Sequence, residues 1–484
     1  MNTEVLIVGA GPTGLTLANE LLVAGVSTTL VDKLAQRSPV SKAGGVQTRA
    51  QEAFDQRGLL EPLLATGNHQ TSTAHFAGIP LLLTRGRHRL PWRTIPQVVI
   101  EGFLEQHLAA HDIHVRRDHE LIGLTQHDDG VTATFANDVT IEAGYVVAAD
   151  GAHSTVRSLL GAEFPGRVGK STAIAADVRL DGDAPMLTRT WSEDGYSAQV
   201  FALGTDPEGR PLHRLALGGP DRSLSRDVPV TEDEIRVGLR SVFGERVRLL
   251  ELRYARRITN VSRQAAQYRH GRVFLAGDAA HVHLPIGAQG MNTGIGDAVN
   301  LGWKLGAAVH NWALERLLDT YHTERHPVAA AVLRNVEAQS LLMDWDGKHD
   351  PDVIAAKDLF ASLTQLPEVQ FHLDDMLSGI GIRYAMPGSD DRPLVGLPAP
   401  DRNIGPTRLH ELLRSGRGIL LDPSDKLAEI ADPWSDRVDR TGVGADTDPM
   451  LVRPDGYVCW TAGGDHSTDG LAAALTSWFG IPHG

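Results

Sequence analysis

The chain has 484 residues, enough for about three domains of ordinary size. Its composition is that of a globular protein, with 42% hydrophobic and 22% charged residues. A formal net charge of −14 argues against a nucleic-acid partner, because domains that bind nucleic acid carry a basic face.

Membrane and secretion signals are missing from the sequence. No apolar run approaches the roughly 20 residues needed to cross a bilayer. The first residues, MNTEVLIVGAG, lack the positive region of a signal peptide. Cys459 is the one cysteine, which excludes an internal disulfide and a cysteine-based zinc site. We therefore expect a cytoplasmic protein with no membrane partner.

The chain opens with the pattern of a βαβ unit. Residues 4–8 (EVLIV) form a β-branched apolar run that predicts a buried strand. Helical spacing follows in LTLANELLVAG and stops at Gly25. The segment STTLVDK then predicts a second strand that ends at Asp32.

The elements after this unit alternate between helical and strand patterns. A polar stretch without periodicity, residues 34–45, predicts a loop. Helices are expected over residues 49–60 and 98–110, short strands between 69 and 92, and further strands at VTATF and YVVAAD.

The second half begins with a mostly β region, residues 166–268, in which strands alternate with turns. GRVFLAGD is another buried strand. Helices are expected over 297–312 and 314–343, and Pro327 should kink or divide the second one. A Pro- and Gly-rich linker covers residues 386–406, and the remainder is enough for a small α/β domain.

The residues Gly9-Ala-Gly-Pro-Thr-Gly14 form a GxGxxG motif. By itself this signal is weak in a chain with 50 glycines. Here it follows a strand, opens a helix and precedes an acidic residue, Asp32, at the end of the next strand, as a dinucleotide site requires. Gly9 would allow the tight turn, Gly11 the approach of the diphosphate and Gly14 the packing of helix on strand. The alternative is an ordinary strand–turn–helix corner, and the motif does not separate FAD from NAD.

Two further motifs separate these possibilities. Residues 146–157 read VVAADGAHSTVR, and residues 272–278 read RVFLAGD and continue AAHVHLPIGAQGMNTGIGDAVNLGWKL. With the first fingerprint they resemble the three sequence marks of the group A flavin-dependent aromatic hydroxylases, the p-hydroxybenzoate hydroxylase-like family. The resemblance covers essentially the whole chain. It is nearest to bacterial aromatic polyketide hydroxylases of angucycline and anthracycline pathways, through phrases such as FDQRGLL and LDTYHTERHPV.

The resemblance implies a fold and its domains. The fold class is α/β, with a discontinuous FAD-binding Rossmann-like domain of the GR2 type, a β-sheet substrate domain and a C-terminal thioredoxin-like domain. The FAD-binding domain would comprise residues 1–70, 95–165 and 270–385, the substrate domain 71–94 and 166–269, and the thioredoxin-like domain 390–484. A working thioredoxin needs C-x-x-C, so the last domain is expected to be structural.

The resemblance also implies the cofactor site. Asp278 would accept a ribityl hydroxyl, the loop from Pro285 to Asn292 would face the flavin pyrimidine ring, and Arg49 and Gln97 would lie near the diphosphate and the isoalloxazine. Lys42 stands where most relatives carry Arg, which puts a bidentate contact there in doubt. The full expected cofactor-binding set is Gly9, Gly11, Pro12, Thr13, Gly14, Asp32, Lys33, Lys42, Arg49, Gln97, Asp150, Gly151, Gly277, Asp278, Pro285, Gly287, Gly290, Met291 and Asn292.

By the same resemblance, the protein is an FAD-dependent monooxygenase that consumes NAD(P)H, with NADPH as the expected donor, and O2. It would hydroxylate an aromatic polyketide-type substrate through a C4a-hydroperoxyflavin. The alternatives are a rifampicin-type antibiotic-modifying enzyme, a Baeyer–Villiger monooxygenase, or a flavin-binding reductase without oxygenase activity. Because the cofactor carries the chemistry, no catalytic side chain is identified.

Several other conspicuous residues are not expected to take part in catalysis. His281 and His283 are expected to pack beside the flavin, since no carboxylate cluster accompanies them as metal ligands would require. Trp92, Trp191 and Tyr196 either line a substrate pocket or belong to the core. Three histidines are expected at the surface, with no catalytic role: His69, His75 and His88.

Overall fold

The computed structural model describes residues 1–67, 75–81, 90–205, 208–347, 350–388, 392–423, 426–444, 448–462 and 468–483. The strands expected between 69 and 92 lie partly outside these ranges, as do His69 and His88. Within them, β4 (His75–Phe76) pairs with β5 (Ile79–Pro80). No described helix is long and apolar enough to cross a membrane.

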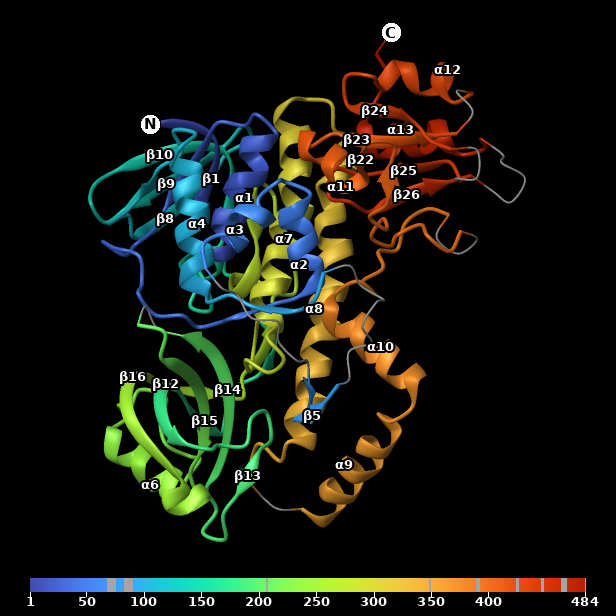
Figure 1. The fold of residues 1–484 in the computed structure, drawn as a ribbon. Helices are drawn as coiled ribbons and strands as arrows, with labels where there is room; N and C mark the ends of the chain where they lie inside the picture. Colours follow the sequence, from blue (N-terminus) through green and yellow to red (C-terminus); the bar gives the residue numbers. More distant parts are fainter. Residues whose placement is uncertain are drawn as a thin grey trace.

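The N-terminal domain is built on a mainly parallel sheet (Figure 1). Its order β19-β10-β1-β2-β7 places the first strand of the chain at the centre, as expected for a doubly wound sheet. The hairpin of β8 and β9 joins β10, and β18 pairs with β19 at the opposite edge. These strands are β1 (Asn2–Val8), β2 (Thr28–Val31), β7 (Val115–Arg116), β8 (Leu121–Gln126), β9 (Val131–Phe135), β10 (Thr140–Ala148), β18 (Arg269–His270) and β19 (Val273–Leu275).

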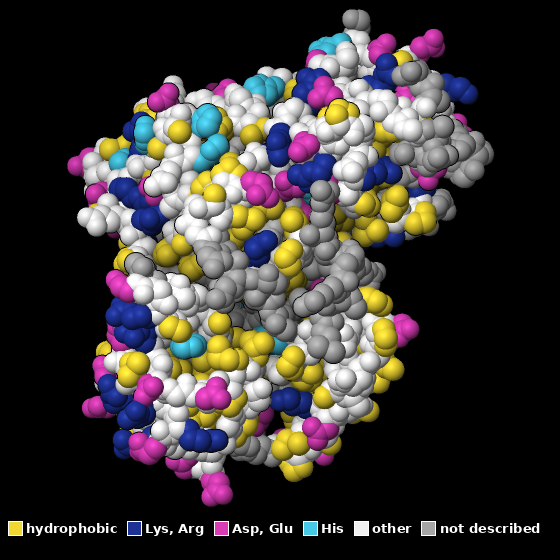
Figure 2. Space-filling view, viewed as in Figure 1, with side chains coloured by type: hydrophobic (Ala, Val, Ile, Leu, Met, Phe, Trp, Pro, Cys, Tyr) yellow, Lys and Arg dark blue, Asp and Glu magenta, His cyan; other side chains and the backbone are white. Residues whose placement is uncertain are grey.

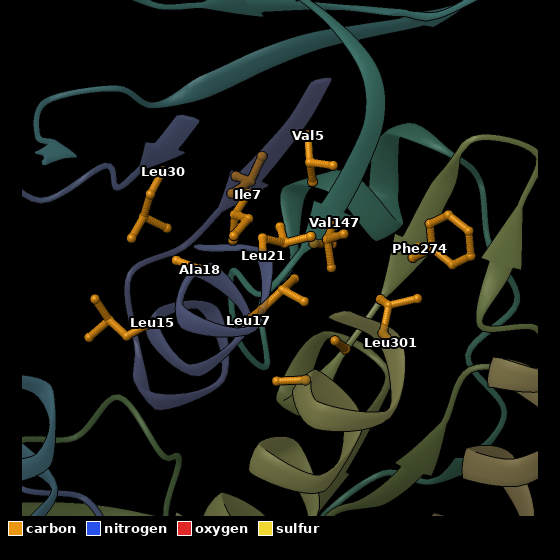
Figure 3. Close-up of a cluster of buried hydrophobic side chains, with 14 of the residues drawn as sticks. Val5, Ile7, Leu15, Leu17, Ala18, Leu21, Leu30, Val147, Phe274 and Leu301 are labelled. Atoms are coloured by element: carbon orange, nitrogen blue, oxygen red, sulfur yellow. The ribbon is translucent and has the colours of Figure 1, made fainter. Parts of the chain in front are cut away.

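Three helices pack on this sheet: α1 (Pro12–Val23), α4 (Gln97–Ala109) and α7 (Gln289–Val309). Apolar side chains of β1, α1, β10, β19 and α7 meet in one core (Figure 3). Helices α1 and α7 approach closely because α7 carries glycines: a Cβ on Gly302 would lie 2.3 Å from Glu20 Cβ. The close contact brings the N-terminal ends of both helices to the same side of the sheet.

Helix α7 starts eight residues before the expected position at residue 297. Its first two turns contain Gly290, Gly294 and Gly296. Because glycine has a low helix propensity, the sequence pattern did not indicate where the helix begins. The segment Gly290–Asn292, expected as loop, is therefore the first turn of a helix.

The β-sheet domain has five antiparallel strands in the order β13-β14-β15-β12-β16. Helix α6 (Glu232–Phe243) covers one face of the sheet, and its apolar residues complete a separate core (Figure 1). The strands are β12 (Thr172–Gly182), β13 (Thr190–Trp191), β14 (Ser197–Thr205), β15 (Pro211–Gly218) and β16 (Val247–Thr259).

Helix α8 (Asp319–Leu342) connects the two domains (Figure 1). It runs unbroken through Pro327, so the prediction of a divided helix is wrong. After it, α9 (Pro351–Leu363) and α10 (Pro367–Ser378) lie beside the β-sheet domain. A mixed core formed by residues of α8, α10, β4, β12 and β16 holds these parts together.

The C-terminal domain contains a four-stranded sheet in the order β24-β23-β25-β26. A parallel pair joined by α12 is followed by two antiparallel strands and α13, which confirms the expected α/β domain. Cys459 is buried in β26. The elements are α11 (Leu409–Leu412), β23 (Gly418–Asp422), α12 (Ala428–Ala431), β24 (Val438–Gly442), β25 (Met450–Val452), β26 (Val458–Thr461) and α13 (Leu471–Phe479).

A buried ionic network joins the C-terminal domain to the N-terminal domain. Arg453, after β25, donates two hydrogen bonds to Glu324 of α8, at 2.7 and 2.9 Å, and others to Asp455. Lys304 of α7 also contacts Glu324 at 2.8 Å. Burial opposes ionisation, but the Arg453 and Lys304 charges lower the pKa of Glu324 to about 2. The three side chains are therefore charged together at neutral pH.

We predict that Arg453→Met destabilises the protein by about 3–5 kcal/mol, because Glu324 and Asp455 would remain buried without their shared cation. The matched control is Arg248→Met, since Arg248 pairs with Asp181 at the surface. An exposed pair of this kind is worth about 0–1 kcal/mol. Denaturant unfolding followed by tryptophan fluorescence measures both. Equal midpoints for the two variants would contradict the prediction.

Candidate functional site

A cavity of about 860 Å³ lies where the N-terminal domain meets the β-sheet domain. Its walls come from the ends of β1, β2 and β10, from the start of α1 and of α7, and from β12, β14 and β15. Figure 2 shows hydrophobic side chains gathered where the upper and lower parts of the molecule meet. The cavity thus opens at the carboxyl ends of parallel strands, where doubly wound sheets bind ligands.

The turn between β1 and α1 depends on its glycines. Gly9 has φ +107°, and a Cβ there would lie 2.3 Å from the Ala149 carbonyl oxygen. A Cβ on Gly14 would lie 1.9 Å from the Gly9 oxygen. Gly11 differs from both, since a Cβ there would meet no atom within 4 Å and would enter the cavity instead. Two glycines therefore serve packing, and the third leaves room for a ligand.

The start of α1 is suited to an anion. Its first turn contains no acidic residue, and no side chain caps its free N–H groups. These groups carry the positive end of the helix dipole toward the cavity. A diphosphate is the anion expected at such a position.

Asp32 lies at this end of the site. Its Oδ2 accepts the Ala10 N–H and its Oδ1 the Leu34 N–H, both at 2.9 Å. These bonds hold the carboxylate at the end of β2, where it lines the cavity. A fixed carboxylate at this place is an acceptor for ribose hydroxyls.

Asp150 and Gly151 lie at the end of the neighbouring strand, β10, and also line the cavity. Asp150 Oδ2 accepts the Val156 N–H at 3.2 Å, while its Oδ1 is buried without a hydrogen-bond partner. Burial raises the pKa of this carboxyl. An unsatisfied buried acceptor beside the cavity fits a ligand with hydroxyl or amine donors. Arg157, by contrast, donates to the Ala279 and Ala152 carbonyls and serves the fold.

Asp278 stands on the short helix η2 (Gly277–Ala279) after β19. Its carboxylate is exposed to the cavity and has no hydrogen-bond partner among the described residues. The turn that presents it is fixed by Asp297 of α7, which accepts the Gly277 N–H at 3.0 Å. Asp297 also accepts from His281 and from Arg325, each at 2.7 Å.

We expected His281 and His283 to pack beside the flavin, and the structure agrees with this in part for each of them. His281 is buried against Asp297. Burial alone would raise the pKa of Asp297, but Arg325 and His281 lower it. His283 lines the cavity, and its Nε2 is buried without a partner. Neither belongs to a group of three or more possible metal ligands among the described residues.

The segment from Pro285 leads into α7 along the cavity wall. Ala288 precedes the helix in the left-handed conformation, φ 53°, which an alanine adopts at a cost of about 1 kcal/mol. As at α1, the first turn of α7 has no acidic residue and no side-chain cap. A second positive helix end therefore faces the cavity.

Most of the expected cofactor residues meet in this cavity. Those that line it are Gly9, Gly11, Pro12, Thr13, Asp32, Lys33, Lys42, Gln97, Asp150, Gly151, Asp278, Pro285, Gly287, Gly290 and Met291. Gly14 and Gly277 lie behind the wall and allow close packing: a Cβ on Gly277 would lie 2.6 Å from Thr13 Oγ1.

Arg49 and Asn292 lie elsewhere. Arg49 lines a second cavity of about 530 Å³, where it donates to the Asp455 carbonyl at 2.6 Å and stacks on Tyr457 of the C-terminal domain. This differs from its expected place by the diphosphate, because α2 (Thr48–Asp55) turns this side chain away from the main cavity. Asn292 holds the backbone instead, accepting the Gln47 N–H and donating to the Gly45 carbonyl.

Glu101 is a site residue that the sequence did not reveal. It lines the cavity from α4 and accepts a hydrogen bond from Gln97 Nε2 at 2.7 Å. Burial raises its pKa. The spacing of four residues to Gln97, on one helical face, was the available signal.

The rest of the cavity lies against the β-sheet domain, and its lining combines apolar and aromatic side chains with arginines such as Arg214 and Arg256. It includes Trp92, Phe201 and Trp345. His75 also lines it, 5.7 Å from the Phe201 ring, so its expected surface position is wrong. Burial lowers the pKa of His75 to about 4, which leaves the imidazole neutral at neutral pH. Trp191 and Tyr196 are not part of the wall.

A family model for an FAD binding domain matches residues 2–336, and a model for the C-terminal part of an aromatic-ring hydroxylase matches residues 392–482. The first covers more than half of the chain. The chain belongs to the family of FAD-binding aromatic-ring hydroxylases. It is an FAD-dependent monooxygenase, and the residues around the cavity fit the cofactor through the open space at Gly11 and the free acceptors at Asp150 and Asp278.

Relatives match over the full chain. The 12-dehydrotetracycline 5-monooxygenase/anhydrotetracycline 6-monooxygenase of Streptomyces rimosus is 39% identical and covers 100% of both chains. The solved structure of OxyS anhydrotetracycline hydroxylase from Streptomyces rimosus superposes with a TM-score of 0.88, at 38% identity and 100% coverage of both. CabE, an aromatic hydroxylase from angucycline biosynthesis, gives 0.88 at 34% identity and the same coverage. A rifampicin monooxygenase of Streptomyces venezuelae is 38% identical over 99% of this chain and 98% of its own.

One cluster of potential metal ligands occurs among the described residues, outside the lining of the main cavity: Asp55, Asp401 and His410. Arg408 donates to Asp55 at 2.9 Å and to Asp401 at 2.6 Å. A guanidinium already neutralises both carboxylates, and the cluster joins α2 to the C-terminal domain. It has the character of a structural ion pair.

We predict that Gly11→Ala folds but binds FAD poorly, because the added methyl group enters the cavity and meets no protein atom. Gly442→Ala is the matched control, since a Cβ there also meets nothing within 4 Å, in the C-terminal domain. The ratio of flavin to protein absorbance after purification measures occupancy, and thermal unfolding checks the fold. Full occupancy in Gly11→Ala would contradict the assignment.

We predict that Asp278→Ala lowers FAD affinity by about tenfold, the loss of one charge-assisted hydrogen bond. Asp128→Ala, at an exposed position outside the cavity, should bind FAD as the wild type does. Titration of the apoprotein with FAD, followed by flavin fluorescence, gives both affinities. An unchanged affinity in Asp278→Ala would remove the carboxylate from the cofactor site.

Proposed function

We propose that this enzyme hydroxylates an aromatic polyketide-type substrate in the cytoplasm, with NADPH as electron donor and O2 as oxygen source. The observation that carries the proposal is the shape of the main cavity. One space joins the expected diphosphate position at α1 to an apolar, aromatic chamber against the β-sheet. A flavin bound at the first end therefore has a substrate chamber at the other.

Bound FAD would supply the redox chemistry, in which two electrons come from the nicotinamide nucleotide, one oxygen atom of O2 reaches an electron-rich ring and the other leaves as water. The residues of this chain have positioning roles. Asp32, Asp278 and the start of α1 would hold the ribose, ribityl and diphosphate groups. The start of α7 would favour negative charge on the pyrimidine ring of the reduced cofactor.

The aromatic walls of the chamber would exclude water from the reacting centre and orient a planar ring. Neutral His75 is available as a hydrogen-bond partner for a phenol or carbonyl oxygen, since its pKa lies well below neutral pH. The full-length similarity to anhydrotetracycline and angucycline hydroxylases supports a fused polycyclic ring as the substrate class.

Modification of an antibiotic of the rifampicin type is the second candidate. The similarity to a rifampicin monooxygenase favours it, at 38% identity over nearly the whole chain. Both candidates need the same cofactor site and the same chemistry, and they differ in the molecule that enters the chamber.

The test is oxygen labelling with the holoenzyme. We expect anhydrotetracycline or a related polycyclic phenol to stimulate NADPH oxidation and to gain one atom of ¹⁸O from ¹⁸O2, as measured by mass spectrometry. Rifampicin is the parallel substrate, and labelling of rifampicin alone would favour the second candidate. Flavin reduction without label in any product would overturn both.

A further inference from the structure

A half-buried arginine, Arg189, and a buried one, Arg222, meet at one end of the substrate chamber. Arg189 lines the cavity just before β13, and Arg222 lies behind it. Both donate to the hydroxyl oxygen of the buried Ser197, Arg189 at 2.8 Å and Arg222 at 3.3 Å. Two guanidinium groups therefore converge on a single neutral acceptor.

The aromatic rings around them add no negative charge. The guanidinium carbon of Arg189 lies 4.9 Å from the Trp191 ring centre and 5.5 Å from that of Trp345. The guanidinium carbon of Arg222 lies 5.2 Å from the Trp191 ring centre, and Arg222 also donates a hydrogen bond to the Trp345 carbonyl. Stacking fixes the plane of each guanidinium and leaves its edge for hydrogen bonds.

Neither arginine is paired with an acid in the part of the chain that the structure describes. Asp344 acts electrostatically on both arginines and Asp346 acts on Arg222, but neither acid forms an ion pair with Arg189 or Arg222 among the described residues. The Nε of Arg189 is buried with no hydrogen-bond partner. Burial and the charge of Arg222 lower the pKa of Arg189, yet the group stays protonated at neutral pH.

An unpaired buried charge is costly, and a second like charge beside it adds to the cost. Other buried arginines of this chain are paired with carboxylates: Arg325 with Asp297, and Arg453 with Glu324. Arg189 differs from them because it lines the main cavity without a carboxylate at ion-pair distance among the described residues. A bound anion would supply the missing partner there.

We propose that Arg189 forms an anion-binding subsite that holds an acidic oxygen of the substrate, an enolate, phenolate or carboxylate on a planar ring system. Met186, Leu187 and Phe201 line the chamber beside it and would receive the apolar part of the same molecule. This inference rests on the proposed function, because it assigns the chamber to an aromatic substrate. It adds the charge of that substrate and the end of the chamber at which the charged edge lies.

The test compares two ligands that share one ring system and differ in charge. They are anthraquinone-2-carboxylate, which is an anion, and its neutral methyl ester. Calorimetric titration of the holoenzyme gives both affinities without turnover. We expect the wild type to prefer the carboxylate by about tenfold, the effect of one charge-assisted hydrogen bond. Arg189→Met should abolish the preference, and Arg189→Lys should reduce it, since lysine keeps the charge but loses the planar fork.

Arg248→Met is the matched control, because Arg248 is an exposed arginine of the same sheet that faces no cavity. It should keep the wild-type preference. Flavin absorbance and thermal unfolding show which variants are folded, and Arg189→Lys decides if Arg189→Met loses FAD. A folded Arg189→Met with the full carboxylate preference, or a wild type with none, would overturn the subsite.

The outcome separates from that of the labelling experiment. A wild type that labels anhydrotetracycline but binds ester and carboxylate alike overturns the anion subsite and leaves the proposed function standing. A preference that depends on Arg189, without labelling of any product, supports the subsite and overturns the proposed function.

Discussion

The buried carboxylate of Asp297 is the interaction on which the rest of the site depends. It receives hydrogen bonds from the Gly277 backbone, from His281 and from Arg325, and so ties the end of β19, the strand β20 (His281–His283) and α8 to the middle of α7. Desolvation would make a lone carboxylate at this depth very unfavourable. Three donors offset that cost, and they hold Asp278 and the start of α7 in fixed positions on the cavity wall.

A second constraint is the close packing of helices around Thr13. A Cβ on Gly277 or on Gly294 would lie 2.6 or 2.3 Å from Thr13 Oγ1, so η2 and α7 pack directly against the Thr13 side chain of α1. Their contact brings two positive helix ends to one cavity, one for a diphosphate and one for a flavin ring. The glycines therefore act through packing as well as through backbone conformation.

The C-terminal domain contributes stability to this arrangement without contributing to the main cavity. The chain from Arg453 to Tyr457 inserts between α2, α7 and α8. Arg49 donates a hydrogen bond to this segment, Glu324 pairs with Arg453, and Lys304 pairs with Glu324. This explains why Arg49, an expected cofactor ligand, does not line the main cavity: it contacts another domain. Asp455 and Tyr457 of the same segment also line the second cavity.

The sequence by itself determined the parts whose chemistry is local. A glycine turn between strand and helix, an acid at the next strand end and the GD of residues 277–278 each identify a piece of the flavin site, because each piece is a short stretch with one geometry. Tertiary structure alone decided what those pieces meet. His75 proved to line the chamber, Arg49 to join two domains, and Arg189 to face a cavity with no ion-pair partner among the described residues. Such positions depend on contacts between residues far apart in the chain, and these leave no periodic or spaced pattern in the sequence.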